Sequence, residues 1–102
     1  MLFAGASEPM EEVRCEKCGA TWLSPTALDA DVGRELASLI RSGNPIAGIR
    51  RLREATGLGL PDAKGVEQHV TREPGKCQRC GAVLGRSGVV TCSQCRSFNH
   101  DW

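Results

Sequence analysis

Residues 77–95 read CQRCGAVLGRSGVVTCSQC, two Cys-x-x-Cys pairs separated by eleven residues. Two residues between the cysteines let one tight turn, called a knuckle here, direct both thiolates at a single ion. Two knuckles supply the tetrahedral sulfur cage that zinc prefers. Apolar residues alternate between the pairs and predict two strands of a β-hairpin. They are Val83, Leu84, Val89 and Val90. The sequence therefore predicts a knuckle, a strand, a glycine turn, a strand and a second knuckle.

This region resembles a zinc ribbon, a small β module held by two knuckles, over about residues 76–97. The resemblance implies one zinc ion bound by Cys77, Cys80, Cys92 and Cys95. Iron in a rubredoxin-like cage is the alternative, and the short spacing and the absence of tyrosine disfavour it. Because a four-thiolate zinc leaves no position for water, we expect a structural ion and no Lewis-acid catalysis.

A third pair, Cys15 and Cys18, also has metal-ligand spacing but is only half of a site. It could join one of the other knuckles, or it could form a second zinc site with His69 and His100. A second copy of the chain could also complete it. We predict Cys15 and Cys18 as metal ligands, and the sequence leaves their partners open.

Zinc is a better prediction than disulfides for these six cysteines. The first twelve residues, MLFAGASEPMEE, contain no basic leader and no long apolar run, so we expect neither a signal peptide nor a membrane anchor. A cytoplasmic chain keeps its thiols reduced. With 102 residues and only four aromatic side chains, the chain also has little material for a core. Small domains of this kind commonly depend on a bound metal.

Helical periodicity fills the middle of the chain. Pro25 follows Ser24, and Pro45 follows Asn44, so each pair predicts an N-cap and a first helical residue. A third helix should start near Pro61. We predict a small zinc-stabilised α+β fold, in which central antiparallel helices are flanked by an N-terminal knuckle and a C-terminal ribbon. The expected segments are a flexible tail (1–12), a zinc knuckle (13–25), a helix (26–43), a helical hairpin (44–71) and a zinc ribbon (72–102).

The hairpin begins NPIAGIRRLREATGLGLPDAK over residues 44–64, with apolar residues on one face and arginines on the rest. Residues 53–60, REATGLGL, and Ala63-Lys64 resemble the C-terminal domain of the bacterial large-subunit ribosomal stalk protein in register. The resemblance covers about residues 44–71. The stalk protein's flanking strands, third helix and dimerisation region have no counterpart, and Gly48 replaces a β-branched apolar residue. The chain is therefore expected to share the hairpin without being a stalk protein.

In the stalk family this hairpin binds translational GTPases, so the resemblance implies a protein partner. The matching contact positions are Ile46, Ala47, Ile49, Arg50, Arg53 and Lys64. The same hairpin could instead persist only as a stable fold.

Three classes of function follow from these features. We predict a non-enzymatic zinc-binding protein-interaction module that contacts a translational GTPase or a ribosome-associated partner. The alternative is a nucleic-acid-binding zinc-ribbon protein, because basic residues lie in or beside the ribbon. These residues are Lys76, Arg79, Arg86 and Arg96. The net charge of only +1 argues against strong electrostatic binding to the phosphate backbone of a nucleic acid. An enzyme ranks last, since the chain has no phosphate loop, nucleophile elbow or His-Glu-x-x-His motif.

Overall fold

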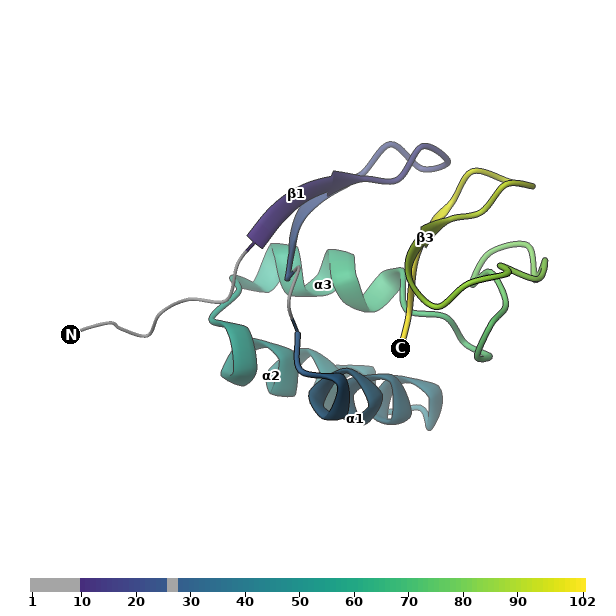
Figure 1. Cartoon of the computed structure of the whole chain (residues 1–102). Helices are drawn as coiled ribbons and strands as arrows, with labels where there is room; N and C mark the ends of the chain where they lie inside the picture. The colour runs from purple at the N-terminus through teal and green to yellow at the C-terminus, as the bar shows by residue number, and fades with distance from the viewer. Residues whose placement is uncertain (1–9, 26–27) are drawn as a thin grey trace.

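The computed structural model describes residues 10–25 and 28–102 and confirms a small α+β fold. The described chain contains three helices and two antiparallel sheets of two strands each (Figure 1). The elements are β1 (Met10–Arg14), β2 (Thr21–Pro25), α1 (Ala30–Arg41), α2 (Pro45–Thr56), α3 (Leu60–Gln68), β3 (Gly88–Thr91) and β4 (Phe98–Asp101). Residues 1–9 of the predicted tail lie outside the described residues.

The N-terminal knuckle is the turn of a β-hairpin. Strands β1 and β2 pair in antiparallel register with Val13 opposite Trp22. Trp22 and Ser24 point inward and are buried, whereas Thr21 and Leu23 are exposed, as the two-residue period of a strand requires. Residues 10–12, predicted as part of a flexible tail, are instead the first residues of β1.

The predicted start of the first helix was wrong. Ser24 and Pro25 are the last residues of β2, and α1 begins at Ala30. The N-cap is Asp29, whose carboxylate accepts hydrogen bonds from the backbone N–H groups of Asp31 and Val32 at 2.8 and 3.3 Å. The pairing of β2 with β1 outweighs the local Ser-Pro signal, because residues up to Pro25 take part in the strand ladder.

The hairpin of residues 44–71 is observed as α2 and α3 joined by a short loop (Figure 1). Pro45 occupies the first turn of α2 as predicted, although Asn44 makes no side-chain capping hydrogen bond. Helix α2 ends at Gly57, whose φ of 79° requires the left-handed conformation that glycine adopts readily. Helix α3 ends at Gln68, three residues before the predicted end.

One hydrophobic core joins the helices to both sheets. Leu36, Ala37 and Ile40 of α1 pack in the same cluster as side chains of α2 and α3, with Trp22 of β2 and Phe98 of β4. Helix α1 lies so close to α2 that a Cβ atom at Gly48 would stand 2.8 Å from Cγ1 of Ile40. This contact gives a physical reason for glycine at position 48.

The predicted strand pairing of the ribbon was wrong. Strand β3 pairs with β4, with Val90 opposite Asn99. The observed partner of β3 therefore follows the last knuckle, whereas the predicted partner, with Val83 and Leu84, precedes β3. Val83 forms only an isolated bridge with Lys76, and its side chain is 76% exposed. All four residues of β4 are buried. Burial of β4 therefore stabilises the observed pairing, whereas Val83 and Leu84 gain little by extending the sheet.

The helices of the described residues are all too short or too polar to cross a membrane.

We expect Gly65→Ala to destabilise the fold, because β2 packs against α3 at this glycine. An added Cβ would lie 2.7 to 2.9 Å from three atoms of Trp22, including its Cβ, which cannot move by side-chain rotation. Overpacking costs about 1–3 kcal/mol, which exceeds the ~1 kcal/mol that alanine gains over glycine in a helix. Chemical denaturation should therefore show a net loss of up to about 2 kcal/mol.

Gly59→Ala is the matched control. Its added Cβ would meet only Cδ of Pro61 at 3.8 Å, and its φ of −68° suits any residue. Because Gly59 is the N-cap of α3, alanine there should cost less than about 1 kcal/mol, and less than the overpacking at Gly65. Equal stability of the two variants would contradict the close packing of β2 on α3.

Candidate metal centres

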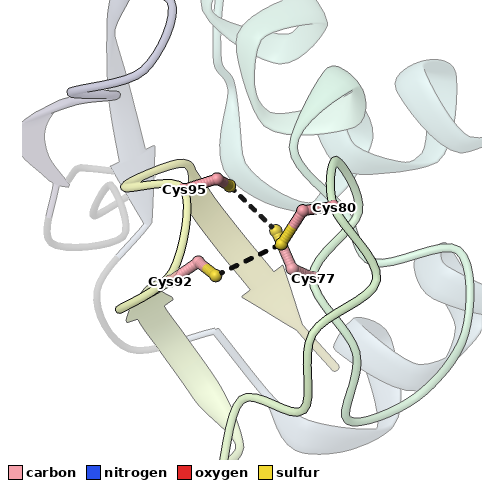
Figure 2. A group of neighbouring side chains, drawn as sticks. All are labelled: Cys77, Cys80, Cys92 and Cys95. Atoms are coloured by element: carbon pink, nitrogen blue, oxygen red, sulfur yellow. Dashed lines mark hydrogen bonds between the residues drawn. The ribbon is translucent and has the colours of Figure 1, made fainter.

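The two C-terminal knuckles bring their four cysteines together (Figure 2). The sulfur atoms of Cys77 and Cys95 are 3.6 Å apart, as are those of Cys80 and Cys92, and all four lie within 4.8 Å of one another. A tetrahedral ion with metal–sulfur bonds of about 2.3 Å would place its sulfurs about 3.8 Å apart. The four cysteines, which the sequence predicted as one ligand set, could therefore hold a metal ion.

All three knuckles have the same backbone turn. The N–H of the first cysteine donates to a carbonyl five residues later in each, with N···O distances of 2.9 Å for Cys15, 2.9 Å for Cys77 and 2.8 Å for Cys92. The residue after the second cysteine has positive φ in each turn. Glycine holds this position in two knuckles, and Arg96, with φ of 70°, holds it in the third.

A left-handed backbone conformation at Arg96 costs about 1–2 kcal/mol. The side chain of Arg96 also makes a contact between two knuckles. Its guanidinium binds both carboxylate oxygens of Glu16, with distances of 2.9 to 3.1 Å. Glu16 lies in the N-terminal knuckle, so this exposed ion pair joins the first knuckle to the third.

Several thiols of the knuckles have shifted pKa values. Burial opposes ionisation of Cys77, but N–H donors from Cys80 and Arg79 and the amide of Asn99 outweigh it and lower its pKa to about 6. Burial and the neighbouring sulfurs raise the pKa of Cys95 to about 12. Without a cation, four crowded thiols do not all ionise. A bound divalent ion would relieve this repulsion, because metal ligands are thiolates.

The first pair of cysteines forms a second group with His69. Sγ of Cys18 lies 3.5 Å from Nε2 of His69, and the ligand atoms of Cys15, Cys18 and His69 are all within 4.8 Å of one another. Cys15 is completely buried, and its sulfur accepts a hydrogen bond from the N–H of Phe98 at 3.4 Å. Burial opposes ionisation of Cys15, but this N–H and that of Cys18 lower its pKa to about 6.

The surroundings of His69 hold its ring in one orientation. Nδ1 lies 2.8 Å from the carbonyl oxygen of Gly65, so Nδ1 carries the proton and donates it. Nε2 then presents its lone pair toward the two cysteines. The ring also stacks on Trp22, with centroids 4.2 Å apart and planes 23° apart. A metal-binding histidine commonly has its other nitrogen held by a carbonyl in this way.

His100 joins neither group, so the alternative in which both histidines complete the first pair does not hold for His100. The ring of His100 is fully buried, packs against Phe98 and Trp102, and has no hydrogen-bond partner for either nitrogen among the described residues. Burial, with a smaller effect of nearby His69, lowers the pKa of His100 to about 3. His100 is therefore a neutral core residue here.

Two polar residues beside the cysteines were not predicted. The Asn99 amide donates to Sγ of Cys77 at 3.6 Å, and the hydroxyl of Ser97 lies 3.7 Å from Sγ of Cys15. Gln78 donates to the Ser97 hydroxyl and, through its backbone N–H, to the Asn99 side chain, both at 2.8 Å. The sequence could not have revealed this chain of contacts, because it depends on how the first and second knuckles pack against the third.

The predicted partner-binding residues lie mainly on one surface. Ile46, Ile49, Arg50 and Arg53 line an open groove of about 560 Å³ on α2 and the following loop. The remaining lining residues are Glu54, Gly57, Leu58 and Leu60. Ala47 and Lys64, the other two predicted positions, are not among the lining residues. The groove lies on the hairpin, apart from both groups of cysteines.

Cys92→Ser should lower the metal content by about one ion per chain, because a tetrahedral site loses one of its four thiolates. Elemental analysis of the purified protein measures this. Ser93→Ala is the control, since Ser93 lies in the same knuckle with an exposed side chain and should leave the metal content unchanged. Equal metal content in the two variants would contradict a metal site at these four cysteines.

Comparisons with known proteins do not extend these observations. No protein-family model, curated protein or solved structure matches this chain. The resemblance of residues 44–71 to the stalk protein and that of residues 76–97 to a zinc ribbon therefore remain interpretations of the sequence. The geometry of the cysteines and the groove is the basis for the function proposed next.

Proposed function

We propose that this chain is a non-enzymatic zinc-binding protein whose α2–α3 hairpin binds a translational GTPase or another ribosome-associated protein. One observation carries the proposal. Four of the six positions that match the contact residues of the stalk family line the same groove. The resemblance rests on amino-acid identities alone, whereas the groove is a property of the folded chain. The two lines of support are therefore separate.

The groove has the chemistry of a protein-binding surface. Ile46 is 73% exposed and Leu60 is 41% exposed, which is unusual for large apolar side chains in a chain with so small a core. Arg50 and Arg53 border these residues and are exposed. An apolar patch with basic residues beside it favours a partner segment with apolar side chains and acidic residues.

Zinc is the metal we propose for both cysteine groups. Thiolate and imidazole ligands suit zinc, and tetrahedral sulfur sets select zinc or iron. The four-cysteine group supplies a complete tetrahedral set, so zinc bound there is structural. Its role is to hold β3 and β4 against the helices. Such a chain can present the hairpin without a large core of its own.

Nucleic-acid binding is the less favoured function. Two of the four basic residues in or beside the predicted ribbon form ion pairs. Arg96 pairs with Glu16 at 2.9 Å, and Lys76 pairs with Glu73 at 3.5 Å. These pairs reduce the positive charge that faces a phosphate backbone. Protein binding through the groove is therefore the better-supported proposal.

The double variant Ile46→Asp with Arg50→Glu should abolish capture of elongation factors in a pull-down. It introduces acidic charge and removes an apolar contact in the groove. Both side chains are exposed, so the fold should be little affected. Arg53 is left unchanged because its guanidinium also donates to the carbonyl oxygen of Leu58 at 3.3 Å. Replacing it would change the stability of the loop as well as the binding surface.

The matched control is Val83→Asp with Arg86→Glu. It replaces the same kinds of exposed residue by the same acids, but on the ribbon. The control should retain capture. Failure of the parent protein to capture any translational GTPase, or equal capture by both variants, would contradict the proposal. Binding to RNA that the control variant loses would favour the nucleic-acid function.

The purified protein should contain zinc and lack visible colour. An iron ion held by four thiolates absorbs visible light strongly, whereas the filled d shell of zinc does not absorb. Elemental analysis together with a visible absorption spectrum distinguishes the two metals. Stoichiometric iron in a coloured sample would show that the identification of zinc is wrong.

A further inference from the structure

We propose that Cys15, Cys18 and His69 bind a second zinc ion through three protein ligands, with a fourth coordination position that is open to solvent and accepts an exogenous thiol. This inference rests on the zinc binding proposed above and does not depend on the partner of the hairpin. It makes the two centres chemically different, one closed by four thiolates and one with an exchangeable ligand.

The three ligand atoms already have the spacing of a tetrahedral site. A zinc ion with bonds of about 2.3 Å to sulfur and about 2.0 Å to nitrogen would place those atoms about 3.5 Å apart. Sγ of Cys18 and Nε2 of His69 are separated by 3.5 Å. Cys15 belongs to the same knuckle and lies within 4.8 Å of both. No large rearrangement is therefore needed to bind the ion.

The ligands are also held in an orientation that suits metal binding. Gly65 accepts the Nδ1 proton of His69, which leaves Nε2 free to coordinate, and Trp22 stacks on the ring. The sulfur of Cys15 receives N–H donors from Phe98 and Cys18, at 3.4 and 3.5 Å. These contacts fix the directions of the imidazole ring and of the Cys15 sulfur, and fixed surroundings of this kind increase metal affinity.

The described residues provide no fourth ligand. No other histidine, cysteine, aspartate or glutamate joins the group. Glu16 is next to Cys15 in the chain, but its carboxylate is bound by Arg96. The Ser97 hydroxyl near Cys15 accepts a hydrogen bond from the Gln78 amide. Residues 10–25 and 28–102 thus leave one of four tetrahedral positions without a charged or imidazole ligand.

This fourth position opens toward solvent. Cys15 is 0% exposed and His69 is 5% exposed, whereas Cys18 is exposed. The group is therefore closed on the core side and open beside Cys18. Three protein ligands with a water in the fourth position is the usual arrangement of an open zinc site.

The expected chemistry at this position is ligand exchange. A small thiol replaces the bound water, its proton passes to solvent, and its sulfur forms the fourth bond to the metal. No electron is transferred in this step. Thiolate is a favourable ligand because zinc bound by sulfur and nitrogen also accepts a soft donor. The four-cysteine group has no vacant position and should not react in this way.

Cobalt-substituted protein gives the direct test, because cobalt reports its ligands through visible absorption and occupies the same sites. Titration with 2-mercaptoethanol should increase the sulfur-to-cobalt charge-transfer absorption of the parent protein. The Cys18→Ser variant, which retains the four-cysteine group, should show no response. An unchanged spectrum of the parent protein at saturating thiol would overturn the proposal.

Native mass spectrometry of the zinc-loaded protein tests the ligand set. A monomer of the parent chain should carry about two ions, and His69→Ala should carry about one. His100→Gln is the matched control and should still carry about two, since His100 lies outside the group. Loss of an ion in folded His100→Gln would overturn the three-ligand arrangement. A second ion seen only in dimers would overturn it as well. If His100→Gln does not fold, the response of the parent protein to thiol decides the question without a variant.

Discussion

Strand β4 lies between the two groups of cysteines and contacts both of them. The backbone N–H of Phe98 donates to Cys15, and the side chain of the next residue, Asn99, donates to Cys77. Both hydrogen bonds end on sulfur, and all four residues of the strand are buried. The position of β4 therefore depends on both groups of cysteines, and each group depends on β4 for a hydrogen-bond donor. The rest of the chain is arranged around this strand.

The helices are connected to the same strand through α3. Its last turn leads to His69, whose carbonyl oxygen accepts the N–H of His100 at 2.7 Å, and the N–H of Thr71 donates to the carbonyl of His100 at 3.0 Å. Arg41 of α1 reaches the same region and donates to the Thr71 carbonyl at 2.8 Å. The hairpin is thus held by backbone pairing at one end, while the groove near Ile46 and Leu60 takes no part in that contact. Leu60 is the first residue of α3, so the groove lies at the other end of this helix from the pairing with β4.

The sequence predicted those features that depend on neighbouring residues. Knuckle spacing brought the four cysteines of residues 77–95 together as expected, and Pro45 begins α2 as its local chemistry predicts. The failures concern long-range packing. Ser24-Pro25 has the local signature of a helix start, yet cross-strand pairing with β1 keeps it in a strand. Val83 and Leu84 have a strand-like pattern, yet burial favours β4 as the partner of β3. The choice of His69 over His100 depends on how α3 packs against β2, and no sequence spacing encodes it.

The two groups of cysteines differ in the length of chain that each one closes. Cys77 and Cys95 are 18 residues apart, whereas Cys18 and His69 are 51 residues apart. Closing the longer loop costs more chain entropy, by about 1 kcal/mol on a logarithmic dependence. Loop closure alone therefore favours assembly of the four-cysteine group before the first knuckle joins the end of α3. His69 connects the N-terminal knuckle, through its side chain, to strand β4, through its backbone.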